Sequence, residues 1–449
     1  MSIIVRKIVA LMAIILISVV HLTYINENSY DLVMRKWFIR RTKLGNETLN
    51  IKFESEYLVK EKSEFLFKNV NFENLGNKRT PNISENHKDP SSWYIIINES
   101  GYYELTDDLW NLSCDCGIFI NASNVTLDGK GHIIDGSGFN RYGIYIYNAV
   151  NVTIKNITIQ EWIFGIYLAF SNKITIIYNT LQDNDYGIYS FASYYGVIKN
   201  NAIQNNNHGI YLEGRTYVWK EDNAYEVYLD SEDNNTIMYN FIVNNGHGLV
   251  LYSSSNNIIM HNIFVENGLF VSYSYRNIVE NNTVNGKMLV YLENQRDLII
   301  NTSVGQVILI NCENITIENQ NISNVTVGVE LWETNRTMIV NSTISDNKCG
   351  VYLWNSYNNM ILNTTIEYNE YGILLYHGYN TIIQNNTVSN NNIGILCFFS
   401  SSNVIMNNTI QNQNEDGITI QLFSVNNTIA FNVIRNNRQY GILLMSNHS

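Results

Sequence analysis

The residues best suited to hold a ligand lie together at 214–231, which reads GRTYVWKEDNAYEVYLDS. Aromatic faces in this segment can stack on sugar rings, and its carboxylates can accept hydrogen bonds from hydroxyl groups. The ligand-binding candidates are Tyr217, Trp219, Asp222, Tyr225, Glu226 and Tyr228. The alternative interpretation is a loop that only folds back over neighbouring strands.

Two histidines are candidates for a metal site. His208 and His247 each directly precede a glycine of a repeated pattern, so they are expected to be stacked neighbours that could bind one metal ion with an acid from 214–231. The same slot holds Tyr142, Phe164 and Tyr186 in earlier repeats. A ladder of aromatic rings therefore explains the histidines equally well, and the predicted functions require no cofactor.

Three carboxylates are the candidates for catalysis. Glu161 and Asp183 occupy the same position in successive repeats, and Asp185 lies two residues further on. Two carboxyl groups about one repeat apart could divide acid and base, or acid and nucleophile, work on a glycosidic bond. Solvated acids on an acidic surface are the alternative interpretation.

The repeat that positions these residues has a period of 22. Glycine followed by Ile and Tyr recurs at Gly143, Gly165, Gly187 and Gly209, and glycines recur with the same spacing at 328, 350, 372 and 394. A fixed period of this size predicts a solenoid. The 214–231 segment is an insert in it, because about 17 extra residues separate Gly209 from the next coil glycine, Gly248. Insertions in such arrays form loops on one face.

Each repeat contains three short stretches with strand periodicity. Within 165–186 the apolar residues alternate at Ile166 and Leu168, then at Ile174 and Ile176, followed by Leu181. Three strands in a 22-residue turn predict an all-β, right-handed parallel β-helix. Asparagines also recur at fixed offsets from the glycines, where stacked amides can hydrogen-bond along the axis. These positions are Asn179, Asn201, Asn386 and Asn408, and Asn184, Asn206, Asn369 and Asn391.

The chain divides into three predicted regions. Residues 1–25 contain Arg6 and Lys7 followed by an apolar run, which predicts an N-terminal hydrophobic helix that acts as a signal anchor or signal peptide. Residues 26–92 hold both prolines and no sustained period, which indicates a polar stalk with one helix near 32–42. The β-helix covers 93–449.

Charge and cysteine content exclude some functions. The net charge is −12, and the acids concentrate after residue 90, so an acidic body makes nucleic acid an unfavourable partner. Five cysteines in a long chain are not a disulfide framework. Cys114 and Cys116 are too close in sequence for an unstrained disulfide, and two ordinary buried thiols are favoured over half of a metal site.

The segment Leu127-Asp-Gly-Lys-Gly-His-Ile-Ile-Asp-Gly136, followed by GIYI and GIYL coils, resembles the NosD-like group of β-helix proteins, which are of the carbohydrate-binding and sugar-hydrolase (CASH) type. The resemblance covers about 93–449. It implies a surface or periplasmic location, and either polysaccharide contact or help in copper delivery to a reductase. No copper motif can be transferred residue by residue.

Together these features predict an extracytoplasmic β-helix, membrane-anchored or secreted, that binds or scaffolds cell-envelope glycan. The runner-up is a polysaccharide lyase or glycoside hydrolase, and the third reading is a copper-delivery accessory protein. The expected partners are a polysaccharide and, through the N-terminal segment, a membrane. The final coil shows no capping element, which predicts a bound partner or end-to-end self-association, or else a truncated chain. About 20 Asn-x-Ser/Thr sequons, such as Asn98, Asn151 and Asn341, suit a glycosylated exterior, although most arise from the repeat itself.

Overall fold

A computed structural model describes the backbone of residues 37–41, 51–55 and 93–445, apart from 215, 220–224 and 229–230, and leaves out the side chains of 37–41, 51–55, 139, 216–219, 225–228 and 231–232. The chain forms two compact units, residues 1–76 and 77–449. The predicted helix at 1–25 lies outside the described residues. No helix among the described residues is long and apolar enough to cross a membrane.

In the first unit, β1 (Trp37–Arg41) pairs antiparallel with β2 (Ile51–Ser55). The helix expected near 32–42 is therefore wrong for residues 37–41. The physical reason is local, because Trp37, Phe38 and Ile39 are aromatic and β-branched residues, which favour strands.

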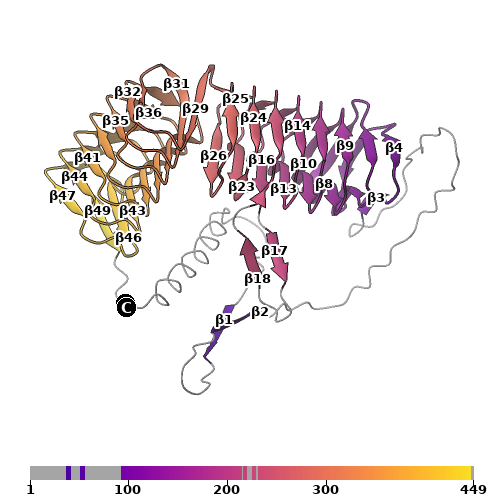
Figure 1. The fold of residues 1–449 in the computed structure, drawn as a ribbon, viewed down its shortest axis with the longest axis horizontal. Helices are drawn as coiled ribbons and strands as arrows, with labels where there is room; N and C mark the ends of the chain where they lie inside the picture. The colour runs from indigo at the N-terminus through magenta and orange to yellow at the C-terminus, as the bar shows by residue number, and fades with distance from the viewer. Residues whose placement is uncertain are drawn as a thin grey trace. The chain divides into compact units, whose positions relative to one another are not determined.

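The second unit is a parallel β-solenoid, as the period predicts. Each coil contributes one strand to each of three faces, and equivalent residues of successive coils pair in parallel register, for example Ile166 with Ile188 and Ile176 with Ile198. Figure 1 shows these coils in two successive stacks, here called the first stack (93–284) and the second stack (287–445). The right-handed sense of the coils stays a prediction from the general handedness of parallel crossovers.

The strands of the first stack follow the faces in chain order. Face 1 consists of β3 (Trp93–Ile97), β6 (Cys116–Ile120), β8 (Ile133–Tyr147), β10 (Thr158–Ala169), β13 (Tyr186–Phe191), β16 (His208–Glu213), β22 (His247–Tyr252) and β26 (Leu269–Ser272). Face 2 consists of β4 (Gly101–Glu104), β7 (Val125–Asp128), β9 (Val152–Lys155), β11 (Thr175–Ile177), β14 (Val197–Lys199), β20 (Thr236–Met238), β24 (Ile258–Met260) and β27 (Ile278–Glu280). Face 3 consists of β5 (Leu109–Leu112), the first parts of β8 and β10, β12 (Thr180–Gln182), β15 (Ala202–Gln204), β21 (Phe241–Val243), β25 (Ile263–Val265) and β28 (Thr283–Val284).

The second stack repeats this plan. Face 1 consists of β29 (Lys287–Glu293), β31 (Val304–Ile310), β34 (Val327–Trp332), β37 (Cys349–Trp354), β40 (Tyr371–Tyr376), β43 (Ile393–Phe398), β46 (Ile418–Gln421) and β49 (Ile442–Met445). Face 2 consists of β30 (Ile299–Ile300), β32 (Thr316–Glu318), β35 (Met338–Val340), β38 (Met360–Leu362), β41 (Ile382–Gln384), β44 (Val404–Met406) and β47 (Thr428–Ala430). Face 3 consists of β33 (Asn321–Ser323), β36 (Thr343–Ser345), β39 (Thr365–Glu367), β42 (Thr387–Ser389), β45 (Thr409–Gln411) and β48 (Val433–Arg435).

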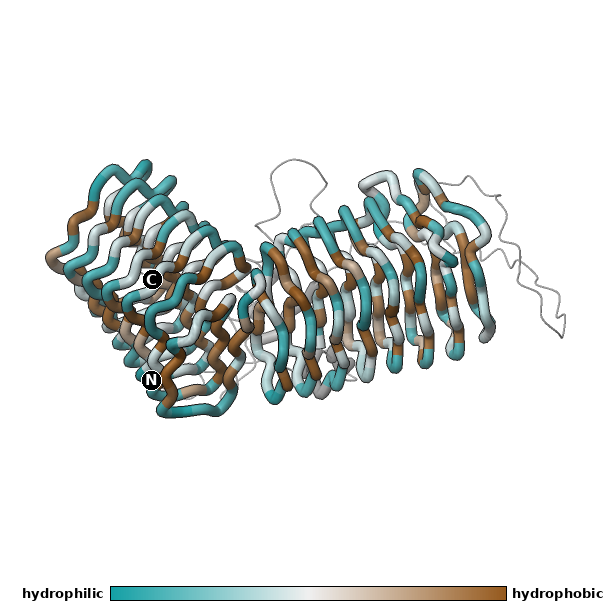
Figure 2. Tube along the Cα trace, turned by 90° about the horizontal axis from the view of Figure 1, so that it is seen from above, coloured by the Kyte–Doolittle hydropathy of each residue, from teal (hydrophilic) through white to brown (hydrophobic). Residues whose placement is uncertain are grey.

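The core is a set of aliphatic columns along the axis. The predicted inward residues of the 165–186 coil are all buried, namely Ile166, Leu168, Ile174, Ile176 and Leu181. Figure 2 shows hydrophobic residues recurring at the same places in successive coils. The coil glycines are required by close packing, because a Cβ on Gly187 would lie 2.6 Å from the carbonyl oxygen of Gly209.

The predicted asparagine ladders are present and buried. Asn179 Nδ2 donates to Asn201 Oδ1 at 3.1 Å, and Asn386 Nδ2 donates to Asn408 Oδ1 at 3.0 Å. The left-handed backbone at this turn belongs to the preceding residue, for example Tyr178 and Asn385, with φ of 59° and 57°. In these coils the turn pairs an exposed left-handed residue with a buried amide.

The two stacks meet at a break that the sequence analysis did not identify. Asn285-Gly286, both with positive φ, forms a tight turn between β28 and β29, which pair antiparallel. The last face 1 strand of the first stack, β26, then lies against the second stack. The amide of Gln306 bonds both Leu269 N and Leu269 O, and Val271 N donates to the carboxyl of Glu330 at 3.3 Å. These side chains form hydrogen bonds with backbone groups of β26 that would otherwise pair with a further strand.

Candidate functional site

The insert lies between β16 and β22 as predicted. Its backbone forms β17 (Thr216–Trp219) and β18 (Tyr225–Tyr228), an antiparallel pair in which Trp219 is opposite Tyr225. Asp222 lies outside the described residues, and the side chains of Tyr217, Trp219, Tyr225, Glu226 and Tyr228 are not described. A short pair, β19 (Ser231–Glu232) with β23 (Ser254–Ser255), follows. The ligand-binding assignment of the insert stays a prediction.

The two histidines are neighbours in the aromatic ladder that the sequence analysis proposed as the alternative to a metal site. His208 is in register with His247, and their rings stack at 4.8 Å with planes 7° apart. The ladder continues through Tyr186, Phe164 and Tyr142 with ring separations of 4.5–5.5 Å. The lone pairs of parallel imidazoles run side by side, which favours the ladder. The metal assignment also needs an acid from the insert, and it stays a prediction.

The other described metal donors form no cluster. No group of three or more His, Cys, Asp or Glu side chains in the described part of the chain could hold a metal ion. The five cysteines are free and buried, as predicted for Cys114 and Cys116. Burial raises the pKa of Cys116 well above its usual value and that of Cys397 to about 12, so both are neutral thiols and not the thiolates that bind metals.

A second aromatic ladder runs beside the first on face 1. It contains Tyr145, Tyr167, Tyr189 and Tyr211, and the last two rings stack at 5.1 Å with planes 3° apart. Burial raises the pKa of Tyr145 and Tyr186 to about 12, so these phenols are neutral. Because the ring faces in both ladders are largely covered by neighbours, face 1 presents mainly ring edges and hydroxyl groups. Ladders of this kind stabilise the solenoid more than they offer flat surfaces to sugars.

The candidate catalytic carboxylates are exposed, Glu161 within β10 and the two aspartates after β12. Glu161 and Asp183 share one left-handed corner position, with φ of 61° and 56°, as the repeat predicts. Asp185 accepts a hydrogen bond from Asn207 Nδ2 at 3.0 Å. Catalysis by these residues stays a prediction.

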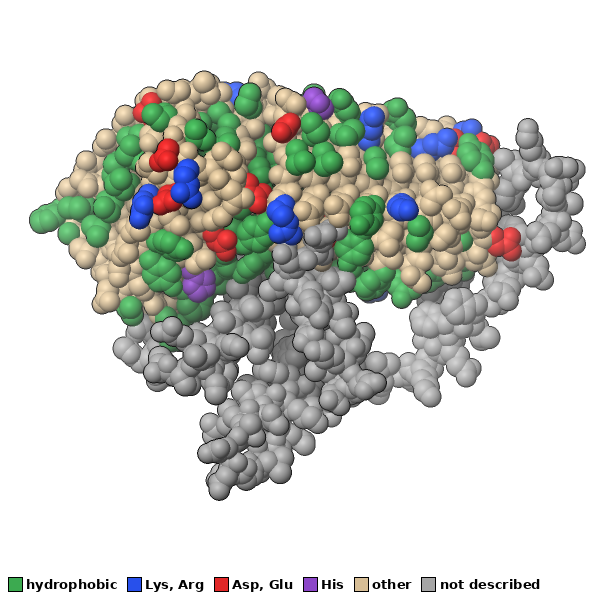
Figure 3. All heavy atoms as spheres, in the orientation of Figure 1, with side chains coloured by type: hydrophobic (Ala, Val, Ile, Leu, Met, Phe, Trp, Pro, Cys, Tyr) green, Lys and Arg blue, Asp and Glu red, His purple; other side chains and the backbone are tan. Residues whose placement is uncertain are grey.

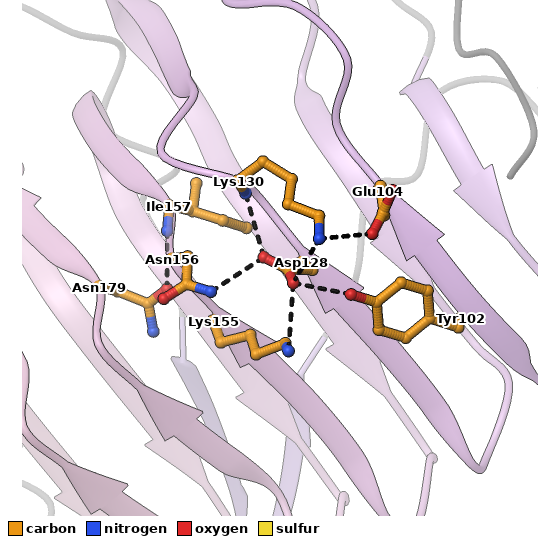
Figure 4. A network of polar contacts seen from close by, with 8 residues as sticks. All are labelled: Tyr102, Glu104, Asp128, Lys130, Lys155, Asn156, Ile157 and Asn179. Atoms are coloured by element: carbon orange, nitrogen blue, oxygen red, sulfur yellow. Dashed lines mark hydrogen bonds and ion pairs between the residues drawn. The ribbon is translucent and has the colours of Figure 1, made fainter.

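A buried carboxylate that the sequence analysis missed lies at the start of the solenoid (Figure 4). Asp128 Oδ2 accepts from Tyr102 OH at 2.7 Å and lies 3.1 Å from Lys155 Nζ, while Asn156 Nδ2 donates to Oδ1 at 3.0 Å. Lys130 completes the cluster between Asp128 and Glu104. Desolvation of Asp128 raises its pKa, but the donors outweigh it and hold the pKa far below the usual range. The carboxylate is ionised at neutral pH and fully occupied, which suits a role in holding the first coils together. Its sequence signal was Asp128 within LDGKG.

Exposed aromatic residues occupy an unusual place on the first stack. We define corner 2/3 as the left-handed residue between the face 2 and face 3 strands of each coil. In the second stack the corner is asparagine in five successive coils, 319, 341, 363, 385 and 407. The next corner of the second stack is Phe431. In the first stack the corner holds asparagine at 156, 200 and 281, but Tyr178, Tyr239 and His261 in the other coils, all with φ of 55–59°. Tyr178 and Tyr239 are 58% and 50% exposed.

The corner aromatics differ from the face 1 ladders in what their faces touch. Asn200 separates Tyr178 from Tyr239, so the two tyrosines are two coils, or about 9.6 Å, apart. Tyr239 stacks on His261 at 4.9 Å, and Lys199 Nζ lies 5.3 Å from the Tyr239 ring centre. Figure 3 shows the charged side chains of one side of the solenoid as scattered among neutral polar and hydrophobic groups.

Comparison with known proteins gives the family. No curated protein matches the chain. The mannuronan C-5 epimerase A-module of Azotobacter vinelandii is 12% identical, with a TM-score of 0.25, over 79% of this chain and 91% of that one. An alginate lyase of Paenibacillus sp. is 14% identical, with a TM-score of 0.30, over 65% and 93%. A DFA-IIIase variant of Arthrobacter chlorophenolicus is 12% identical, with a TM-score of 0.32, over 62% and 71%. Similarity at this level carries no information on activity.

The family match is to residues 130–282 and 293–449, the two sides of the break between the stacks. It confirms the resemblance seen in the LDGKG segment and the glycine coils. Because the match spans more than half of the chain, the protein belongs to the family described as periplasmic copper-binding protein (NosD).

Proposed function

We propose that the protein is an extracytoplasmic, surface-attached β-solenoid that binds an extended cell-envelope glycan along corner 2/3 of its first stack. The observation that carries this proposal is that the exposed rings of Tyr178 and Tyr239 occupy left-handed corners that hold asparagine in most other coils. The periplasmic description of the family supports the extracytoplasmic location.

A bulky side chain at a left-handed corner has a local energetic cost. A bulky residue in the left-handed region is strained, whereas asparagine is one of the residues that best tolerate it. An exposed ring also gains nothing from burial. Tyr178 and Tyr239 therefore oppose local stability, and a ring offered to a ligand explains their presence. Sugar rings have apolar faces that stack on aromatic rings, and Lys199 supplies a hydrogen-bond donor beside Tyr239.

The spacing suits a polymer. Tyr178 and the Tyr239–His261 pair lie on one line parallel to the axis, far enough apart to contact separate sugar rings of one chain. The insert is a second part of this proposal, since it follows β16 and carries four further aromatic residues, Tyr217, Trp219, Tyr225 and Tyr228, with acceptors Asp222 and Glu226.

The test replaces the rings with the residue that the repeat itself uses. In Tyr178→Asn, Tyr239→Asn and the double variant, binding to a glycan array and to purified cell-envelope polysaccharide should fall about two- to tenfold per ring, because a ring contact is worth about 0.5–1.5 kcal/mol. The melting temperature should stay equal or rise, since asparagine suits the corner better.

Tyr195 is the matched control. It is also a left-handed corner residue, with φ of 58° and 56% exposure, but it lies at the corner between faces 1 and 2. Tyr195→Asn should keep full binding. Equal losses in all three single variants, or none in the double variant, would remove corner 2/3 from the proposal.

The same assay separates the binding protein from the enzymatic alternative. Shortening of the bound polysaccharide, abolished by Asp183→Asn, would favour a lyase or hydrolase that uses Glu161, Asp183 and Asp185. Copper delivery is not part of the proposal, because the described residues contain no group of three or more donors that could hold a metal ion.

A further inference from the structure

Four sequons of the second stack lie in one column at corner 2/3. They are Asn341-Ser-Thr, Asn363-Thr-Thr, Asn385-Asn-Thr and Asn407-Asn-Thr. The four asparagines have φ of 49–57° and are exposed. The sequon threonines begin β36, β39, β42 and β45 and are in direct register, Thr343 with Thr365, Thr387 and Thr409. Each threonine is on the outward side of its strand, since the following Ile or Val is buried.

The middle residue of each sequon has a different task. Asn386 and Asn408 are buried and bond each other in the interior ladder, and Ser342 and Thr364 fill the same slot. The repeat therefore explains the second position of these sequons. It does not require the first and third positions to be Asn and Thr, because Tyr239 and Phe241 occupy them in the first stack.

The amide nitrogens distinguish this column from several other sequons. Sugar attachment takes place on Asn Nδ2. Asn151 Nδ2 donates to Asn124, Asn156 Nδ2 to Asp128 and Asn314 Nδ2 to Asp297, at 2.6–3.0 Å. Among the described contacts, Asn341, Asn363, Asn385 and Asn407 form hydrogen bonds through their backbone N–H only. Their amides can thus be modified without the loss of a contact that stabilises the fold.

We propose that this column is an N-glycosylation surface, distinct from the glycan-binding corner of the first stack. In the reaction, an oligosaccharyl transferase joins Asn Nδ2 to the anomeric carbon of a lipid-diphosphate-linked sugar. The bond from that carbon to the phosphate oxygen breaks, the lipid diphosphate leaves, and the amide proton passes to a base of the transferase. The sequon hydroxyl and an extracytoplasmic location are the general requirements.

The spacing limits how many sites are used. Adjacent asparagines of the column are one coil apart, about 4.8 Å, which is too little room for bulky glycans on both. We expect modification of non-adjacent members in any one molecule, such as Asn341 with Asn385 or Asn363 with Asn407.

The experiment is mass spectrometry of peptides from the full chain, purified from the envelope of the cells that produce it. No Lys or Arg occurs between Lys348 and Arg435, so chymotrypsin is needed to separate three of the sites. Peptides with Asn341, Asn363, Asn385 or Asn407 should carry sugar-containing mass increments. A variant with Thr343, Thr365, Thr387 and Thr409 all changed to Val, which keeps the β-branched shape, should lose them and stay folded.

Thr158→Val is the matched control, since it removes the sequon of Asn156, whose amide is occupied. Its intact mass should equal that of the wild type apart from the substitution. Unmodified peptides at all four column asparagines would overturn the proposal, and so would equal occupancy at Asn151 and Asn156. Neither result bears on glycan binding by Tyr178 and Tyr239, so the two proposals fail separately.

Discussion

Glu330 is completely buried where the first stack meets the second. An apolar residue would be expected at such a position. Its Oε1 accepts the backbone N–H of Val271, and Oε2 has no hydrogen-bond partner among the described residues. Burial raises its pKa well above the ordinary value. The carboxyl is therefore held as a neutral acid. It accepts the backbone hydrogen bond of Val271 that a neighbouring strand would otherwise accept.

This burial predicts a pH dependence of stability. A raised folded-state pKa means that the folded chain holds the proton more tightly than the unfolded chain does. The free energy of unfolding should then fall as pH rises above the ordinary Glu pKa, by about 1.4 kcal/mol per pH unit until the buried carboxyl ionises. Glu330→Gln keeps an acceptor for Val271 N and removes this dependence.

The measurement is thermal unfolding between pH 5 and pH 8. The wild type should lose stability over this range, and Glu330→Gln should be flatter and more stable at pH 8. Glu266→Gln, which alters an exposed carboxylate on a turn, should follow the wild type. A wild-type profile in Glu330→Gln would show that this carboxyl does not set the pH dependence.

At the scale of elements, the insert is separable from the coil that carries it. The strands on either side pair directly, since Ile210 is in register with Leu249, and Gly214 N donates to Tyr252 O at 3.1 Å. These equivalent residues are 39 apart and not 22, so removal of residues 215–230 leaves a nearly normal coil of 23.

Deletion of 215–230 should therefore leave the melting temperature within a few degrees of the wild type. Glycan binding should fall, because the aromatic residues of the insert are lost. Retained binding would place the site on the corner column alone. A failure to fold would show that the insert is a structural cover of its neighbouring strands.

At the scale of the whole molecule, the predicted attachment to a membrane rests on the apolar run of residues 8–20. We expect the full-length protein to stay in the membrane pellet after carbonate washing, because such a run extended to residue 25 approaches the length needed to span a bilayer. Ile15→Arg, which places a charge in the run, should move the protein to the supernatant. Release of the wild type with a new N-terminus beyond residue 20 would indicate a cleaved signal peptide.

The sequence by itself determined the solenoid, because every coil must bury the same small set of side chains and therefore repeats the same pattern of residue types. The 22-residue period, the inward Ile166 and Leu168, and the amide ladder of Asn179 and Asn201 could all be read directly, as could the stacking of His208 on His247. In parallel in-register stacking, residues one period apart in the sequence are neighbours in space. This is why these local predictions succeeded.

Only the tertiary structure decided what breaks the repeat. The contact of β26 with Gln306 and Glu330 joins residues far apart in sequence, and no periodicity encodes it. The partners of Asp128 come from three different coils, so its full occupation could not be inferred from LDGKG alone. The difference between occupied and unoccupied sequon amides, Asn156 against Asn363, depends on which side chain lies beside each corner. The period fixes which residues are neighbours along the axis, but contacts across the axis and between stacks depend on side-chain packing in three dimensions.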